Sequence, residues 1–166
     1  MLIALYVMSK LNRKVNFSVA NISIITPDSF EGTWIPSFKF RDFELTKAVN
    51  VNQELFKEEV LSEVFKDNVE VVFSHINNSI GLSKLLMWET LYVYINWMYK
   101  NLYETTNNKK YLNDLKFITK DVSSDVFGNY IENPFSTFNS HEKRKTCCLA
   151  YLSNSKNKFC ENCPKI

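Results

Sequence analysis

The first 146 residues of this chain contain no cysteine, and the whole chain has only three glycines and two histidines. Three scattered glycines, Gly32, Gly81 and Gly128, build neither a G-x-G-x-x-G dinucleotide turn nor a Walker A phosphate loop. No serine or cysteine lies in a hydrolase motif. Bound NAD(P)H, bound ATP and serine or cysteine hydrolysis are therefore not expected.

The chain also lacks a dominant charge and a long apolar run. Its 20 basic and 18 acidic residues leave a formal charge of +2, so nucleic acid is not an expected partner. Glu89, Asn96 and Lys100 interrupt the most apolar stretch, 85–102, so no membrane span is expected. The apolar start has neither a basic region before it nor a cleavage site after it, which favours a helix over a signal peptide. The expected location is the cytoplasm.

The pattern of apolar residues predicts a single α+β domain. It favours a mainly helical domain with a small antiparallel sheet near the N-terminus and an irregular C-terminal metal-binding segment. Alternating residues between 15 and 45 predict two or three strands, and Trp34 with Arg41 there are weighed as chelate-pocket residues against ordinary sheet packing. Helical spacing is found at 2–11, 52–66, 69–81, 83–105 and, more weakly, 109–121.

The longest predicted helix, 83–105, is expected to be the central core element. Ser83 is its predicted N-cap, and Trp97 is expected in the core with the apolar stripe. His75 is expected to be a partly buried polar residue of the preceding helix, and His141 an ordinary loop residue. The stripe consists of Leu85, Trp88, Leu91, Tyr92, Ile95, Met98 and Leu102.

Four cysteines lie close together near the end of the chain: Cys147, Cys148, Cys160 and Cys163. In a reducing compartment such a cluster indicates ligands of one metal centre rather than disulfides. Only Cys160-x-x-Cys163 has the turn spacing of a zinc ribbon. The adjacent pair suits a 2Fe-2S centre, whose ligands are divided between two irons. Spacing alone leaves iron and zinc open.

The run Arg144-x-x-Cys147-Cys148-x-x-Tyr151, followed by Cys160-x-x-Cys163-Pro164, resembles the C-terminal signature of the FhuF-like ferric-siderophore reductases. In that family the four cysteines hold a 2Fe-2S cluster. The resemblance implies that these cysteines are the cofactor-binding and metal-binding residues, with no catalytic residue beyond them. It divides the chain into a body at 1–142, the candidate siderophore-binding region, and a four-cysteine segment of the same domain at 143–166.

The resemblance implies an enzyme that reduces iron(III) in a cytoplasmic siderophore complex by one electron and releases ferrous iron. The expected partners are a ferric siderophore, of hydroxamate type, and an external donor such as a ferredoxin or flavoprotein. Six basic residues near the cysteines are expected to stabilise the cluster's negative charge or steer a partner. They are Lys143, Arg144, Lys145, Lys156, Lys158 and Lys165.

Two departures from the family pattern keep alternatives open. The stretch between Cys148 and Cys160 is one residue longer than usual, which a polar loop absorbs. Met1 falls well inside the family domain, so an N-terminal portion is expected to be missing. The alternatives are a zinc-stabilised binding module without enzyme activity and a shortened relative that retains only electron carriage.

Overall fold

The computed structural model describes residues 1–26, 37–47, 52–138, 143–148, 151, 159–160 and 163–166. Its fold is α+β and mainly helical, as predicted. The helices are α1 (Leu2–Leu11), α2 (Gln53–Val64), α3 (Glu70–Ile80), α4 (Lys84–Thr106) and α5 (Lys110–Lys116). The strands are β1 (Arg13–Val15), β2 (Ile22–Ile25), β3 (Ser37–Phe40) and β4 (Leu45–Lys47). None of the described helices is long and apolar enough to cross a membrane.

The strands form two short antiparallel ladders, β1 with β4 and β2 with β3. The buried side chain of Asn21 holds the segments next to β2 and β3 together. Its amide nitrogen donates to the carbonyl oxygens of Asn16 and Asp42, and its amide oxygen accepts the Asp42 N–H. The prediction of antiparallel strands near the N-terminus is therefore confirmed, although the described residues form four strands where two or three were predicted. The expected strand residue Trp34 lies outside the described residues.

α2 and α3 form a nearly continuous rod, because a π-helical turn over Phe65–Val69 replaces the break expected between two helices. The side-chain oxygen of Asn52 caps the rod by accepting the N–H of Glu54 at 2.9 Å. The rod ends at Gly81, whose φ of 70° lies in the left-handed region that glycine adopts readily. No described residue of α3 is buried, and His75 is exposed there rather than partly buried.

α4 is the central helix, as predicted, and its buried Trp88 lies in an aromatic cluster. The Trp88 ring centroid lies 5.7 Å from that of Phe127 and 5.4 Å from that of Phe135. Trp97 was wrongly expected in the core, since 62% of it is exposed. Nine positions at about 3.6 residues per turn place it on the face opposite Trp88. Ser83 occupies the N-cap position without a side-chain capping bond.

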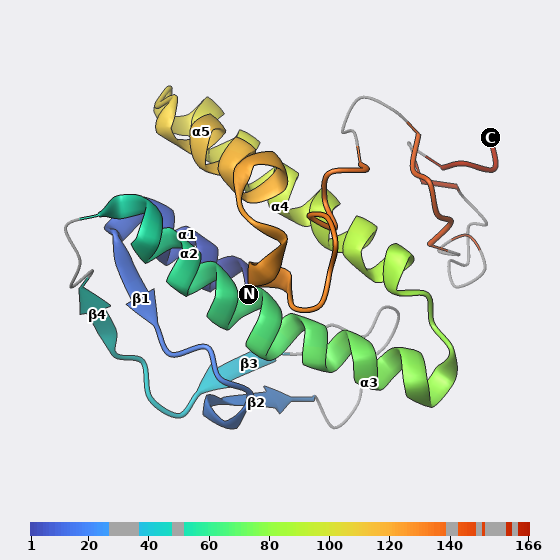
Figure 1. Ribbon diagram of the computed structural model, residues 1–166, viewed down its shortest axis with the longest axis horizontal. Helices are drawn as coiled ribbons and strands as arrows, with labels where there is room; N and C mark the ends of the chain where they lie inside the picture. The colour runs from blue at the N-terminus through green and yellow to red at the C-terminus, as the bar shows by residue number, and fades with distance from the viewer. Residues whose placement is uncertain (27–36, 48–51, 139–142, 149–150, 152–158, 161–162) are drawn as a thin grey trace.

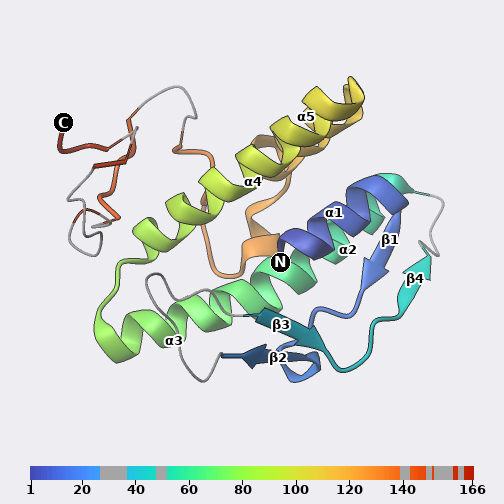
Figure 2. The same cartoon turned by 180° about the vertical axis from the view of Figure 1, so that it is seen from behind.

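Both ends of α4 have neighbours (Figure 1). α5 packs along its C-terminal half, and a hydrogen bond of 2.7 Å between Ser9 and Tyr99 joins α1 to it. The C-terminal cysteine segment lies beside its N-terminal half, on the opposite side from the strands, and Figure 2 shows the same arrangement from behind. This half of α4 therefore positions the cysteines.

Candidate metal centre

A buried carboxylate on α4 holds the backbone that leads into the first cysteine pair. Glu89 is 3% exposed, and its Oε1 accepts the backbone N–H of Lys145 at 2.5 Å. Its Oε2 accepts the backbone N–H of Thr146 at 2.9 Å and also the Thr146 hydroxyl. We call this set of hydrogen bonds, with that from Arg144, the Glu89 clasp. It fixes the chain one residue before Cys147.

Arg144 completes the clasp from the side. Its Nε donates to Glu89 Oε2 at 3.4 Å, and its Nη2 donates to the hydroxyl of Thr90 at 2.8 Å. Burial by itself raises the pKa of Glu89, but the bonds from Thr146, Lys145 and Arg144 outweigh burial and hold that pKa below its usual value. The carboxylate is therefore charged at neutral pH. The Arg144 side chain therefore binds two residues of α4, whereas the sequence had suggested that its charge stabilises the cluster.

Three of the four thiols are close neighbours. Burial raises the pKa of the Cys160 thiol, and the adjacent thiols of Cys148 and Cys163 raise it further. The N–H of Cys163 donates to the carbonyl oxygen of Cys160 at 3.1 Å, so the backbones of these two cysteines are in contact. Cys163 is 1% exposed, and Lys165 lies within electrostatic reach of Cys147 and Cys163. The two halves of the cysteine motif are thus brought together.

An aromatic pair links the same two halves. Tyr151 follows the vicinal cysteines and Phe159 precedes Cys160, and their ring centroids lie 4.8 Å apart. The ammonium of Lys165 donates to the Tyr151 hydroxyl at 2.7 Å. Offset contacts between aromatic rings stabilise a structure by about 0.5–1.5 kcal/mol beyond their buried area. Tyr151 therefore has a structural role inside the motif.

The donor set fits a 2Fe-2S cluster. Within the described part of the chain, no group of three or more His, Cys, Asp or Glu side chains surrounds a single metal-ion position. A 2Fe-2S cluster does not require such a group, because each iron takes two of the four thiolates. Four thiols, with Cys160 beside Cys148 and Cys163, can supply that set.

Sequence reasoning missed Glu89 as a site residue and treated it only as an interruption of an apolar run. The available signal was an acid at a position surrounded by core residues of a helix, since a buried carboxylate needs donors. Of the six basic residues, Lys156 and Lys158 lie outside the described residues, as does His141. Arg41 is exposed after β3.

These features define a C-terminal iron–sulfur segment anchored on a helical body. Residues 144–165 match the family model described as the FhuF 2Fe-2S C-terminal domain. The match confirms the resemblance of the cysteine segment and the 2Fe-2S cofactor, and it begins at the residue that donates to Glu89. No curated protein and no solved structure matches the chain.

Proposed function

We propose that this protein is a ferric-siderophore reductase whose electron-transfer site is the C-terminal segment. The match of residues 144–165 to the FhuF 2Fe-2S domain carries this proposal. We assign Cys147, Cys148, Cys160 and Cys163 as the four cluster ligands. The proximity of Cys160 to two of the other thiols supports that assignment.

When bound, a 2Fe-2S cluster supplies one-electron redox chemistry. The substrate is iron(III) held by the hard oxygen atoms of a siderophore, of hydroxamate type. Such ligands hold ferric ion more tightly than the softer ferrous ion, so gain of one electron loosens the complex. Each ferrous ion released consumes one electron from an external donor, a ferredoxin or a flavoprotein. The proposed location is the cytoplasm.

The chain's own residues hold and orient the cluster segment. We propose that 1–142 form the body with the siderophore-binding region and that 143–166 form the cluster segment of the same domain. The Glu89 clasp joins the two parts through part-buried hydrogen bonds. Lys165, beside two of the four thiols, adds positive charge near a centre of net negative charge.

The test is a single-turnover reaction of the purified protein. The cluster is reduced anaerobically, and a ferric trihydroxamate chelate is then added while visible absorption is followed and ferrous iron is trapped by a coloured chelator. We expect the spectrum of the oxidised cluster to return with one ferrous ion per cluster. The gallium(III) complex of the same ligand is the control, because it binds without accepting an electron.

Two results would contradict the proposal. A colourless protein containing one zinc ion would favour the zinc-stabilised binding module without enzyme activity. A reduced cluster that the ferric chelate leaves unchanged would favour an electron carrier without reductase activity.

A further inference from the structure

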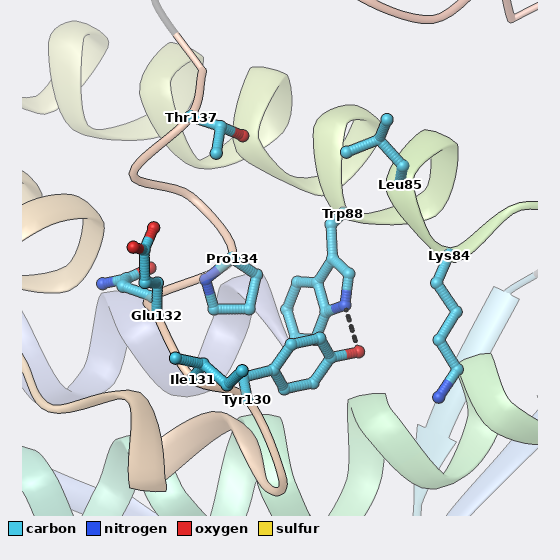
Figure 3. Close-up of a pocket in the computed structure, with 9 residues that line it drawn as sticks. Lys84, Leu85, Trp88, Tyr130, Ile131, Glu132, Pro134 and Thr137 are labelled. Atoms are coloured by element: carbon cyan, nitrogen blue, oxygen red, sulfur yellow. Dashed lines mark hydrogen bonds between the residues drawn. The ribbon is translucent and has the colours of Figure 1, made fainter.

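A cavity of about 480 Å³ lies between the start of α4 and the loop 130–137 (Figure 3). That volume is in the range of small-molecule sites. α4 contributes one wall and the loop contributes the other. The lining residues are Lys84, Leu85, Trp88, Tyr130, Ile131, Glu132, Asn133, Pro134 and Thr137.

Hydrogen bonds hold the aromatic walls of this cavity in place. The indole Nε1–H of Trp88 donates to the hydroxyl of Tyr130 at 2.9 Å, and that hydroxyl donates to Glu70 Oε2 at 2.6 Å. The two rings meet edge to face, with centroids 5.8 Å apart. Glu70 is in turn bonded by Lys84 and by Ser74. The cavity is therefore preformed, which lowers the cost of binding a ligand.

The charge of the lining selects against a highly charged ligand. Only Lys84 and Glu132 carry charge among the lining residues, and the two charges have opposite sign. The Lys84 ammonium is already shared by Glu70 and by Ser74, whose hydroxyl oxygen it reaches at 2.8 Å. Most of the remaining wall is apolar or aromatic, and burying an uncompensated charge against it is costly. A ligand with no net charge and much apolar surface suits this wall best.

The cavity adjoins the metal centre along α4. Leu85 lines the cavity and stands one helical turn before Glu89, on the same side of the helix. Trp88 lines it too and is the immediate neighbour of Glu89 in the chain. A ligand in the cavity and the clasped cysteine segment therefore share one rigid helix as support.

We propose that this cavity is the docking site of the ferric chelate, and this inference rests on the proposed function. The site takes an uncharged complex, in which three singly charged oxygen ligands balance iron(III). A complex of three doubly charged catecholates carries three negative charges and is excluded. The chelate lies against Tyr130 and Leu85, with Ile131 at the rim.

The test measures binding to the holoprotein by calorimetry, with the gallium(III) trihydroxamate complex as the probe. Ile131 is 99% exposed, so Ile131→Glu adds a charge at the rim without disturbing the core. Leu85→Glu, at a side chain 47% exposed, adds one on the α4 side. The matched control is Ile25→Glu, at a half-exposed residue of β2 that does not line the cavity. We expect each rim variant to weaken binding about tenfold, or about 1.4 kcal/mol, and the control to match wild type.

Equal binding by wild type and both rim variants would overturn the site. Gallium triscatecholate binding as tightly as the trihydroxamate would overturn the charge selection. The proposed function fails separately, when the gallium complex binds in the cavity but the ferric complex does not oxidise the reduced cluster. If the ferric complex oxidises the reduced cluster rapidly but the rim variants bind the gallium complex as tightly as wild type, the proposed function stands and the proposed docking site is wrong.

Discussion

The carboxylate of Glu89 in the middle of the chain accepts both the backbone N–H and the side-chain hydroxyl of Thr146, the residue directly before the vicinal cysteines. The two residues are 57 positions apart. A buried anion with four donors stays ionised and holds them in place. A charged hydrogen-bond network thus attaches the start of the metal-binding segment to α4.

Glu89→Gln is expected to raise the reduction potential of the cluster. The amide is nearly isosteric and still accepts hydrogen bonds, but it removes a buried negative charge and leaves the Arg144 charge uncompensated. Both changes favour the more negative, reduced cluster. A spectroelectrochemical titration measures the shift, with Glu104→Gln on the exposed end of the same helix as the control. An unchanged potential in Glu89→Gln would show that the cluster does not sense this charge.

Serine at any one of the four cysteines is expected to abolish or severely destabilise the cluster. A hydroxyl is a poor substitute for a thiolate ligand of iron. Visible absorption and the iron and sulfide content of Cys160→Ser and Cys163→Ser should fall close to zero, while the far-ultraviolet circular dichroism of the helical body persists. Thr146→Ser keeps the hydroxyl of the clasp and should retain the cluster. Full cluster content in either cysteine variant would remove that residue from the ligand set.

The local sequence pattern predicts the helices of the body, but it predicts the metal site only in part. The stripe through Trp88, Tyr92 and Ile95 predicts α4 because apolar side chains at helical spacing must share one face. The same spacing would have excluded Trp97 from the core. Leu85 also belongs to the predicted stripe, yet it is 47% exposed because it faces the cavity.

The cysteine motif is visible in the sequence because its four cysteines lie close together in the chain. The clasp is not visible, because Glu89 and Thr146 meet only after the body has folded. The π-helical turn at Phe65–Val69 is similarly hidden. Phe65 in this turn contacts Phe127, with ring centroids 4.9 Å apart, and such a long-range contact does not show in a local pattern that is helical on both sides.

A second buried charge, in the body, gives a stability test. Asp114 is 1% exposed and its Oδ1 lies 2.6 Å from Lys57 Nζ, while its Oδ2 has no hydrogen-bond partner among the described residues. Lys57→Met leaves the carboxylate unpaired and should cost about 3 kcal/mol of unfolding free energy. Urea denaturation measures the loss. The exposed pair of Lys116 and Asp121 is the control, and Lys116→Met there should cost less than about 1 kcal/mol.

The double variant Lys57→Met with Asp114→Leu distinguishes the loss of the ion pair from the loss of side-chain packing as the cause of the lower unfolding free energy. An apolar pair of similar volume carries no desolvation cost, so it should recover most of the stability lost by Lys57→Met alone. A double variant no more stable than Lys57→Met would show that the loss comes from packing around the aliphatic stem of the lysine.

The lowered pKa of Glu70 predicts that part of the free energy of unfolding is lost in acid. Its burial raises the pKa, but hydrogen bonds from Lys84, Tyr130 and Ser74 outweigh burial and leave the pKa below its ordinary value. A carboxyl with a lowered folded-state pKa contributes stability that is fully present above the unfolded pKa of about 4.3 and is lost as pH falls through the folded pKa. Glu70→Gln should therefore cost about 1–2 kcal/mol at neutral pH, with the difference from wild type shrinking below about pH 4.

Urea denaturation of wild type and Glu70→Gln across that pH range measures this difference. Acid loss of the cluster affects both proteins and cancels when they are compared at each pH. Glu132→Gln, at an exposed carboxylate that lines the same cavity, is the matched control. If the loss of unfolding free energy in Glu70→Gln stays constant down to the lowest pH, Glu70 stabilises the fold through packing. A contribution from its charge must disappear when the carboxylate is protonated.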